Sequence, residues 1–482
     1  MKTSFLFCSA FGGVLGYYAL SLFSPPVSLV LAACALPAVF AAGKIMKKDS
    51  SLSPAALAVA AALGLAAGCV SGTAARKPFS PGLPPEKITL LKGTLLDDPR
   101  TGRSGGGFAN LAVSSAGAGN LPGCDTVRSS ADGTVMVFFP DSSIPRLTEF
   151  GRGGEIFVEG AFSKRADRAG VFGARAVHLV TPSSPLEQFR TGARSSLVQS
   201  LYALDKSGLA AALLLGSRDN LDQGLADSYR EAGLSHILAL SGMHLSFFSG
   251  ILAFLLKKPL GKKAAAGAGL LFIAVFVFMV GPQPSLVRAA IMYAIGVWAV
   301  LFGMPKHTLA FLAAAFLLQI AIDPVSGFSV SFMLSYAALA GLLLLGNKLA
   351  FLMNGRVPPF LAGALSASLG AFIASAPFVS AFFGDLRPGG IISGIVIVPL
   401  TTLFMALSLM FLASGGFLPP AASAVLAFLE KCITVTVSAA AGIPGVPAPF
   451  YPVLAASVFL AGLVCFAENR LGKYRNRLEP FA

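Results

Sequence analysis

Residues 264–281 read AAAGAGLLFIAVFVFMVG, a run of eighteen residues without a charged side chain. As a helix this run is about 27 Å long, close to the roughly 30 Å of hydrocarbon in a bilayer. Similar runs recur along the chain, which is 55% apolar and only 12% charged. Soluble domains carry about twice that charged fraction. The sequence therefore predicts a polytopic α-helical membrane protein and excludes an ordinary soluble one.

About twelve such runs are predicted to cross the membrane. They lie at 4–22, 27–43, 52–72, 234–256, 264–281, 285–303, 308–322, 328–346, 360–383, 390–413, 421–441 and 450–467. Short cytoplasmic loops are enriched in Lys and Arg, which gives a check on this count. With twelve spans and Lys2 inside, every basic loop falls on the cytoplasmic side, together with both termini, and residues 76–233 lie outside the membrane.

The region 76–185 follows a different pattern. Five stretches rich in β-formers lie between Gly, Pro and Asp turns, at 88–96, 108–114, 134–139, 155–162 and 171–180. Five short strands in about 95 residues suit one small extracytoplasmic β-barrel of the OB type. Apolar residues of 185–205 then recur at helical spacing, which predicts an amphipathic helix that lies at the membrane interface or braces the barrel.

These features predict five segments in the chain. They are a three-span membrane segment (1–75), the OB-like domain (76–185), the amphipathic helix with a connector (186–233), a second membrane domain (234–467) and a basic cytoplasmic tail (468–482). The net charge is +14. Most of the excess lies in the cytoplasmic loops and the tail, so it reflects membrane insertion and is not by itself evidence for a nucleic-acid partner.

Polar side chains inside apolar spans are costly to bury in lipid and usually face a cavity or one another. The candidates within spans or at their ends are His236, Ser241, His244, Arg288 and Asp323, and Asp385 and Arg387 lie in an outer loop. Several fall toward the outer ends of their spans and are predicted to line an outer vestibule. The alternative is a structural ion pair between Arg288 and Asp323, with a solvated loop at Asp385.

The run that contains Ser241, Gly242 and His244 has more than one interpretation. Gly242 beside Ser241 predicts a kink or break where backbone groups face an aqueous path. Ser241 and His244 are three residues apart, so an intramembrane hydrolase is an alternative, although no third orienting group is apparent. His236 and His244 lie about 80° apart around one helix. No metal site, cofactor or catalytic residue is predicted.

Four blocks of sequence carry a family signature. They are LGSR at Leu215–Arg218, EAGLSHILALSGMHL at Glu231–Leu245, PSLVRAAIM at Pro284–Met292, and Asp323-Pro324 leading into SFMLSY at Ser331–Tyr336. Together they resemble the ComEC competence family of DNA-uptake membrane channels. The N-terminal spans and the external OB-like domain also match the layout of that family, and the resemblance extends through Pro377–Pro399.

The resemblance implies passage of single-stranded DNA across the cytoplasmic (inner) membrane during natural transformation. The signature positions are His236, Ser241, Gly242, His244, Arg288, Asp323 and Ser335. Implied partners are single-stranded DNA, membrane lipids and separate DNA-receptor, nuclease and cytoplasmic motor proteins, and an oligomer is possible. A C-terminal metallo-β-lactamase-like nuclease domain, present in many relatives, is not expected in this chain. Ser217 and Met333 depart from the family pattern, which has an acidic residue and a Gln there.

The outer barrel is predicted to contact DNA. Candidate cations are Arg100, Arg103, Lys164, Arg165, Arg168 and Arg175, with Phe108, Phe157 and Phe172 as candidate stacking aromatics. The alternative assigns these cations to solvated loops and these aromatics to the barrel core. A small-solute membrane transporter is the other alternative function for the whole chain.

Overall fold

The computed structural model describes the chain from residue 80 to residue 478, with gaps. The described residues are 80–81, 84–96, 100–101, 106–118, 127–140, 143, 152–163, 171–181, 184–204, 208–218, 221–240, 242–303, 307–415 and 419–478. The three spans predicted before residue 75 lie outside them. The chain forms two compact units. The barrel unit is Arg76–Ala203 with Phe278–Gly281, and the helical unit contains Leu204–Val277 and Pro282–Ala482.

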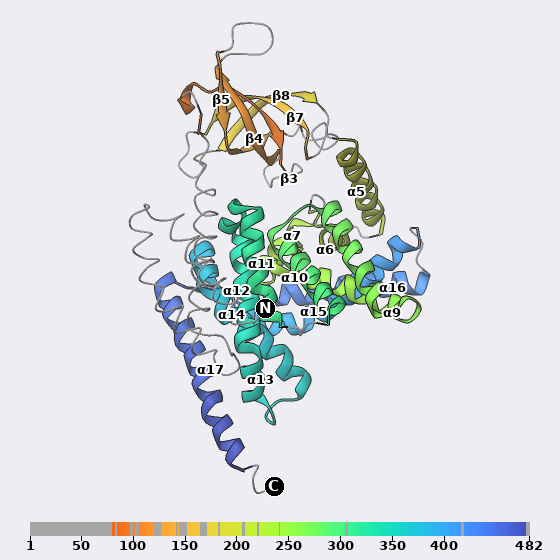
Figure 1. The fold of residues 1–482 in the computed structure, drawn as a ribbon, viewed down its shortest axis with the longest axis vertical. Coiled ribbons are helices and arrows are strands. Elements are labelled where there is room, and N and C mark those ends of the chain that lie inside the picture. Colours follow the sequence, from red (N-terminus) through yellow and green to blue (C-terminus); the bar gives the residue numbers. More distant parts are fainter. Residues whose placement is uncertain are drawn as a thin grey trace. The chain divides into compact units, whose positions relative to one another are not determined.

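Five strands of the barrel unit form a closed ring (Figure 1). They are β2 (Leu90–Leu95), β4 (Gly107–Ala118), β6 (Thr134–Phe139), β7 (Glu155–Phe162) and β8 (Val171–Thr181). Each overlaps one of the five predicted stretches, so a small five-stranded barrel is confirmed. Three more strands extend its edges: β1 (Ser80–Pro81), β3 (Arg100–Thr101) and β5 (Val127–Asp132).

The ring runs β2–β4–β6–β8–β7 and returns to β2. Neighbouring strands in an antiparallel ring must alternate in direction, and an odd number of strands cannot alternate all the way round. One pair must therefore be parallel. The parallel pair is β6 and β8, in which Met136 lies opposite Val171 and Phe138 lies opposite Gly173. The other four pairs are antiparallel.

Alternating side chains of the five strands fill the barrel. The fully buried positions include Leu91, Leu111, Val137, Val158 and Phe172. Phe172 packs edge-on against Phe162, with ring centroids 5.1 Å apart. The prediction that Phe172 stacks on DNA bases is therefore wrong, because Phe172 is a core residue.

Two glycines allow strands of the barrel to approach one another closely. Gly160 lies at an irregularity of the β7–β8 pairing, where a Cβ atom would be 1.9 Å from the carbonyl oxygen of Gly173. Gly93 lies at an irregularity of the β2–β4 pairing, where a Cβ atom would be 2.2 Å from the carbonyl oxygen of Ala112. Any other residue would force the backbones apart.

We expect Gly160→Ala to destabilise the barrel by about 1–3 kcal/mol, the usual cost of overpacking a core. Limited proteolysis of the purified chain in increasing urea measures this loss. Gly173→Ala is the matched control, because its Cβ would meet only the carbonyl oxygen of Ala161, at 3.7 Å. Equal stability of the two variants would contradict the close approach at Gly160.

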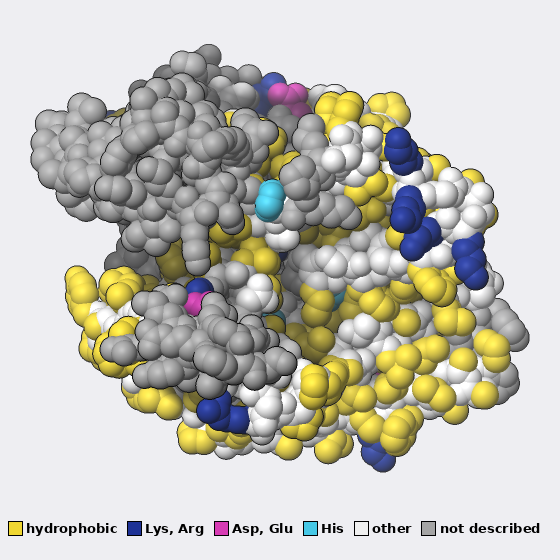
Figure 2. All heavy atoms as spheres, turned by 60° about the horizontal axis from the view of Figure 1, so that its bottom comes forward, with side chains coloured by type: hydrophobic (Ala, Val, Ile, Leu, Met, Phe, Trp, Pro, Cys, Tyr) yellow, Lys and Arg dark blue, Asp and Glu magenta, His cyan; other side chains and the backbone are white. Residues whose placement is uncertain are grey.

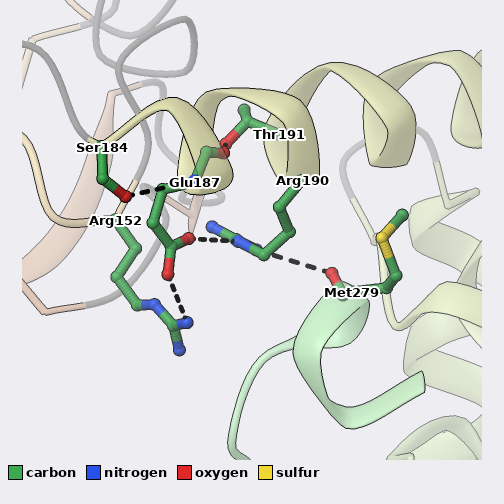
Figure 3. A network of polar contacts seen from close by, with 6 residues as sticks. All are labelled: Arg152, Ser184, Glu187, Arg190, Thr191 and Met279. Carbon is green, nitrogen blue, oxygen red and sulfur yellow. Dashed lines mark hydrogen bonds and ion pairs between the residues drawn. The ribbon is translucent and has the colours of Figure 1, made fainter. Parts of the chain in front are cut away.

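Helix α5 (Pro185–Leu204) follows the barrel, where the periodicity predicts a helix. Three charged residues, Arg152, Glu187 and Arg190, hold its first turns, and we call them the clamp (Figure 3). Glu187 accepts from Arg152 of the barrel at 2.7 Å and from Arg190 at 2.5 Å. Arg190 is fully buried and also donates to the carbonyl of Met279 at 3.5 Å. Burial raises the pKa of Glu187, but its hydrogen bonds with Arg152 and Arg190 outweigh this and leave the pKa below its ordinary 4.5.

We expect Glu187→Gln to destabilise the barrel unit at neutral pH by about 3 kcal/mol, because it leaves the buried charge of Arg190 without its carboxylate. A carboxylate with a lowered pKa stabilises the fold above its ordinary pKa and loses that effect as the pH falls through the lowered value. Urea-dependent proteolysis at pH 7 and below pH 4.5 should therefore show wild type approaching the variant only in acid. Glu155→Gln, which breaks a half-exposed pair with Lys92, is the control.

The helical unit is described by helices α6 to α17. Their bounds are α6 (Leu209–Leu215), α7 (Gln223–Glu231), α8 (Ser235–Leu238), α9 (Gly242–Val280), α10 (Pro284–Leu301), α11 (Thr308–Ile322), α12 (Val330–Gly341), α13 (Asn347–Met353), α14 (Pro359–Phe383), α15 (Gly389–Ala413), α16 (Pro420–Ala441) and α17 (Phe450–Leu478). Hydrophobic side chains cover much of the described surface in Figure 2, with Lys and Arg in small groups. Seven helices within the described residues are long and apolar enough to cross a membrane, so the chain is a multi-pass membrane protein.

Helix α9 is bent back on itself at Gly261, whose φ of 77° is not helical. The rings of Phe248 and Phe276 are 5.5 Å apart, whereas a straight helix would separate these residues by about 42 Å. The two predicted spans 234–256 and 264–281 therefore lie in one hairpin. The predicted total of twelve spans is not confirmed, because three lie outside the described residues and α11 has only 15 residues.

Helices α12 and α14 cross in close contact. A Cβ on Gly341 would lie 2.2 Å from the carbonyl oxygen of Gly370. Directly after Gly341 the chain forms one turn of π-helix, Leu342–Gly346, before it continues as α13. The crossing fixes α12 against α14, about one and a half helical turns beyond the residues of α12 that enter the site described next.

Candidate functional site

The first span of the helical unit is broken. The short helix α8 ends at Leu238, Ala239 is extended, and α9 begins at Gly242. The prediction of a break at Gly242 is confirmed, and this break divides the predicted span 234–256 between α8 and α9. His236 and His244 consequently belong to two different helices, so their spacing around one helix has no meaning.

The first turn of α10 satisfies the backbone at this break. The hydroxyl of Ser285 donates to the carbonyl of Leu240 at 2.8 Å, and both residues are buried. A carbonyl released from a helix needs a new donor when water is excluded. Ser285 supplies that donor, so α10 is docked on the break.

Arg288 lies one turn further along α10 and is 8% exposed. Its Nη1 donates to the main-chain carbonyl of Ser335 on α12, and its guanidinium lies 5.7 Å from the ring centre of Tyr336. Its Nε is buried without a hydrogen-bond partner among the described residues. Ser335, predicted as a site residue, therefore meets Arg288 through its backbone.

Gln319 joins α11 to the same group. Its amide nitrogen donates to the carbonyl of Pro284 at 3.0 Å, and its amide oxygen accepts from the hydroxyl of Tyr336 at 3.0 Å. We call the side chains of Ser285, Arg288, Gln319 and Tyr336, with the carbonyls that they contact, the Arg288 cluster. The cluster connects α10, α11 and α12 with the break before α9.

Gly242 allows the guanidinium to approach the start of α9. A Cβ at this position would lie 3.1 Å from Nη2 of Arg288 and 3.1 Å from Cβ of Ala289. Both distances are tighter than ordinary contacts, so a side chain at Gly242 would press on Arg288. Of the predicted site residues, the structure thus brings together Gly242, Arg288 and Ser335.

Asp323 is exposed and lies at the C-terminal end of α11. Its carboxylate accepts from the amide of Ser326 at 3.3 Å, which starts the short helix Pro324–Phe328. An ion pair with Arg288 is not among the described contacts. The predicted alternative of a structural Arg288–Asp323 pair is therefore wrong, and Arg288 has no carboxylate partner in the described part of the chain.

Asp385 lies in a second polar group. Its carboxylate accepts from Nε of Arg387 at 2.9 Å, and Nη1 of Arg387 donates to the carbonyl of Glu231 at 2.7 Å. Asp385 also belongs to the strand β9 (Asp385–Leu386), which pairs with β10 (Val446–Pro447). The predicted alternative of a merely solvated loop is wrong, because this group fastens the loop to the end of α7.

The remaining predicted residues are placed as follows. The side chain of His236 is exposed, and that of His244 is buried near the start of α9. Ser241, Arg103, Lys164, Arg165 and Arg168 lie outside the described residues, and Arg100 lies in β3, where its backbone is opposite Phe108. No group of three His, Cys, Asp or Glu side chains in the described ranges is arranged to hold a metal ion.

Sequence reasoning did not single out Gln319, Ser285 or Tyr336 as site residues. Gln319 carries a clear signal: it is an amide in the middle of an otherwise apolar span, at 308–322. Ser285 and Tyr336 lie inside the signature blocks but carry no charge. Their roles depend on contacts across 45 and 17 residues, to Leu240 and Gln319, which no local pattern reveals.

We expect Ser285→Ala to destabilise the helical unit by about 1–3 kcal/mol, because the buried carbonyl of Leu240 loses its donor. Thermal unfolding of the purified chain in detergent measures the loss. Ser393→Ala is the matched control, since the hydroxyl of Ser393 donates only to Gly389, within its own helix. If both variants unfold at the temperature of wild type, the docking of α10 on the break is contradicted.

Comparison with known proteins places this site in a family. A family model described as "Competence protein" matches residues 213–470. ComE operon protein 3 of Bacillus subtilis (strain 168) is 26% identical over 150 residues, which are 31% of this chain and 19% of that protein. An uncharacterized protein of Aquifex aeolicus (strain VF5) is 30% identical over 210 residues, 43% of this chain and 48% of that protein.

The aligned regions thus span about a fifth and about half of these two relatives. The family match is broader, since it covers more than half of the chain. It includes every residue of the Arg288 cluster. The chain therefore belongs to the ComEC family of competence proteins.

Proposed function

We propose that this protein conducts single-stranded DNA across the cytoplasmic membrane during natural transformation. Membership of the competence family fits a role in DNA uptake. The observation that carries the finer proposal is Arg288, a guanidinium buried among membrane helices with no carboxylate partner in the described residues.

An uncompensated cation in a low-dielectric region is costly, and ionisable residues in membrane segments usually serve a pathway. A passing phosphodiester offers the missing negative charge. The second membrane domain is also poor in acidic groups: between Glu231 and Glu430 the sequence contains only Asp323 and Asp385. Asp385 is already paired with Arg387. A polyanion would therefore meet little repulsion beside these helices.

The broken helix supports the same path. Discontinuous helices expose backbone groups to bound ions and substrates in many membrane transport proteins. Here the break between α8 and α9 lies against Arg288, because Gly242 leaves room for Nη2. We propose that the strand passes this point and that His236, Ser241, His244 and Asp323 contribute to the path as further signature residues.

We propose that the barrel contacts the strand outside the membrane. Small barrels of this kind hold single strands through basic grooves and exposed aromatics. Phe108 and Arg175 are exposed, and Lys92 lies 5.5 Å from the ring centre of the half-buried Phe157. Arg100, Arg103, Lys164, Arg165 and Arg168 remain predicted contacts.

The proposed orientation places residues 76–233 on the outer side and both termini in the cytoplasm, as the distribution of Lys and Arg among the loops predicts. The proposed role is transport without catalysis. Separate receptor, nuclease and motor proteins would then bind, degrade and pull the DNA. Assembly into an oligomer is compatible with this proposal.

We expect Arg288→Met to reduce internalised DNA by about 100-fold, the factor that corresponds to about 2.7 kcal/mol of lost charge stabilisation. Met keeps much of the volume and removes the charge. Arg288→Lys should keep part of the import, because it retains a cation. The assay measures labelled DNA bound at the surface and protected inside the cell separately, and surface-bound DNA should not change.

Arg230→Met is the control variant. Arg230 is an exposed arginine of the same unit, paired with Asp227, and its loss should leave import intact. Membrane levels of all three variants are compared by immunoblot. Normal import in Arg288→Met would overturn the proposed path, and uptake of a small solute by vesicles that do not import DNA would favour a solute carrier instead.

A further inference from the structure

Helix α5 presents an apolar stripe that the barrel unit leaves uncovered. Leu186 and Phe189 are 61% and 70% exposed, and at helical spacing they continue into the half-buried Ala193 and Leu197. The side chains of such a stripe lie on one face of a helix. Exposed apolar residues that gather in this way mark a contact with another apolar phase or molecule.

Two other faces of α5 are already accounted for. Gln188, Gly192, Ser195 and Gln199 form an exposed polar stripe next to the apolar one. The third face is buried and carries Arg190 and Leu201. A helix with an apolar flank, a polar flank and a protein-facing side has the arrangement expected at a boundary between lipid and water.

A hydrogen bond within the barrel unit joins α5 to the last turn of α9. Arg190 donates to the carbonyl of Met279, as Figure 3 shows, and Met279 lies in the last turn of α9, a helix apolar enough to cross a membrane. The end of a span lies where hydrocarbon gives way to headgroups. The start of α5 is therefore joined to the end of an apolar helix.

We propose that the stripe Leu186–Phe189–Ala193–Leu197 inserts into the headgroup and acyl-chain boundary of the phospholipid bilayer. The occupant is lipid because the stripe contains no cation to bind a nucleic acid and is joined to the end of a span. Arg152 connects this part of α5 to the barrel, because it binds Glu187, which lies between Leu186 and Phe189 in the sequence. This inference is independent of the proposed DNA path.

The chain offers a direct spectroscopic test, because Trp298 is its only tryptophan. In a Trp298→Phe background, Phe189→Trp puts a fluorescent probe on the apolar stripe. Gln188→Trp, one residue away on the polar stripe, is the matched control. Both full-length variants are reconstituted into phosphatidylcholine vesicles in which the acyl chains are brominated either near the glycerol or near the methyl end.

We expect the Phe189→Trp probe to be quenched about twofold more strongly by the shallow bromines than by the deep ones, because interfacial helices enter only about 5–10 Å. The Gln188→Trp probe should respond mainly to aqueous acrylamide. Quenching of both probes by acrylamide alone would overturn the proposal. So would protection of the Phe189→Trp probe from both quenchers, which would indicate cover by protein such as a second copy of the chain.

Discussion

A guanidinium buried between apolar helices needs hydrogen-bond acceptors. The helices around Arg288 are placed so that one such acceptor lies within reach. The acceptor is the main-chain carbonyl of Ser335, so α12 must lie at a fixed distance from α10. The close crossing at Gly341 and Gly370 also fixes α12 against α14. Gln319 then joins α11 to both helices, through Pro284 and Tyr336. The relative positions of three helices thus depend on Arg288 together with Gln319.

The four signature blocks are far apart in the sequence but meet at this point. Gly216 of the first block ends α6 with a φ of 69° and packs against Leu240 of the second. Leu240 accepts from Ser285 of the third, and Arg288 donates to Ser335 of the fourth. Several of these contacts use the backbone. The blocks therefore specify the local backbone conformation as well as the functions of their side chains.

Much of the architecture could be predicted from local patterns. The strands 134–139 and 155–162 coincide with β6 and β7, and the apolar run 308–322 coincides with α11. Alternation and continuous apolar runs are properties of short windows, which is why they were informative. The role of Phe172 was not predictable, because the face of β8 that points into the core depends on how the strands pair. The partners of Arg288 and Asp323 could not be predicted either, because they depend on which helices become neighbours.

The odd number of strands in the barrel ring has a consequence for how this domain folds. Hairpins between consecutive strands can form as soon as both strands exist, but the parallel β6–β8 pair joins residues 35 apart with β7 between them. Contacts of such separation form late, because loop closure must come first. The ring consequently stays open until the start of β8, Val171–Gly173, has been synthesised and is free to pair with β6. Until then the edges of β6 and β7 remain available for other strands, so this interval is when the barrel is most exposed to mispairing.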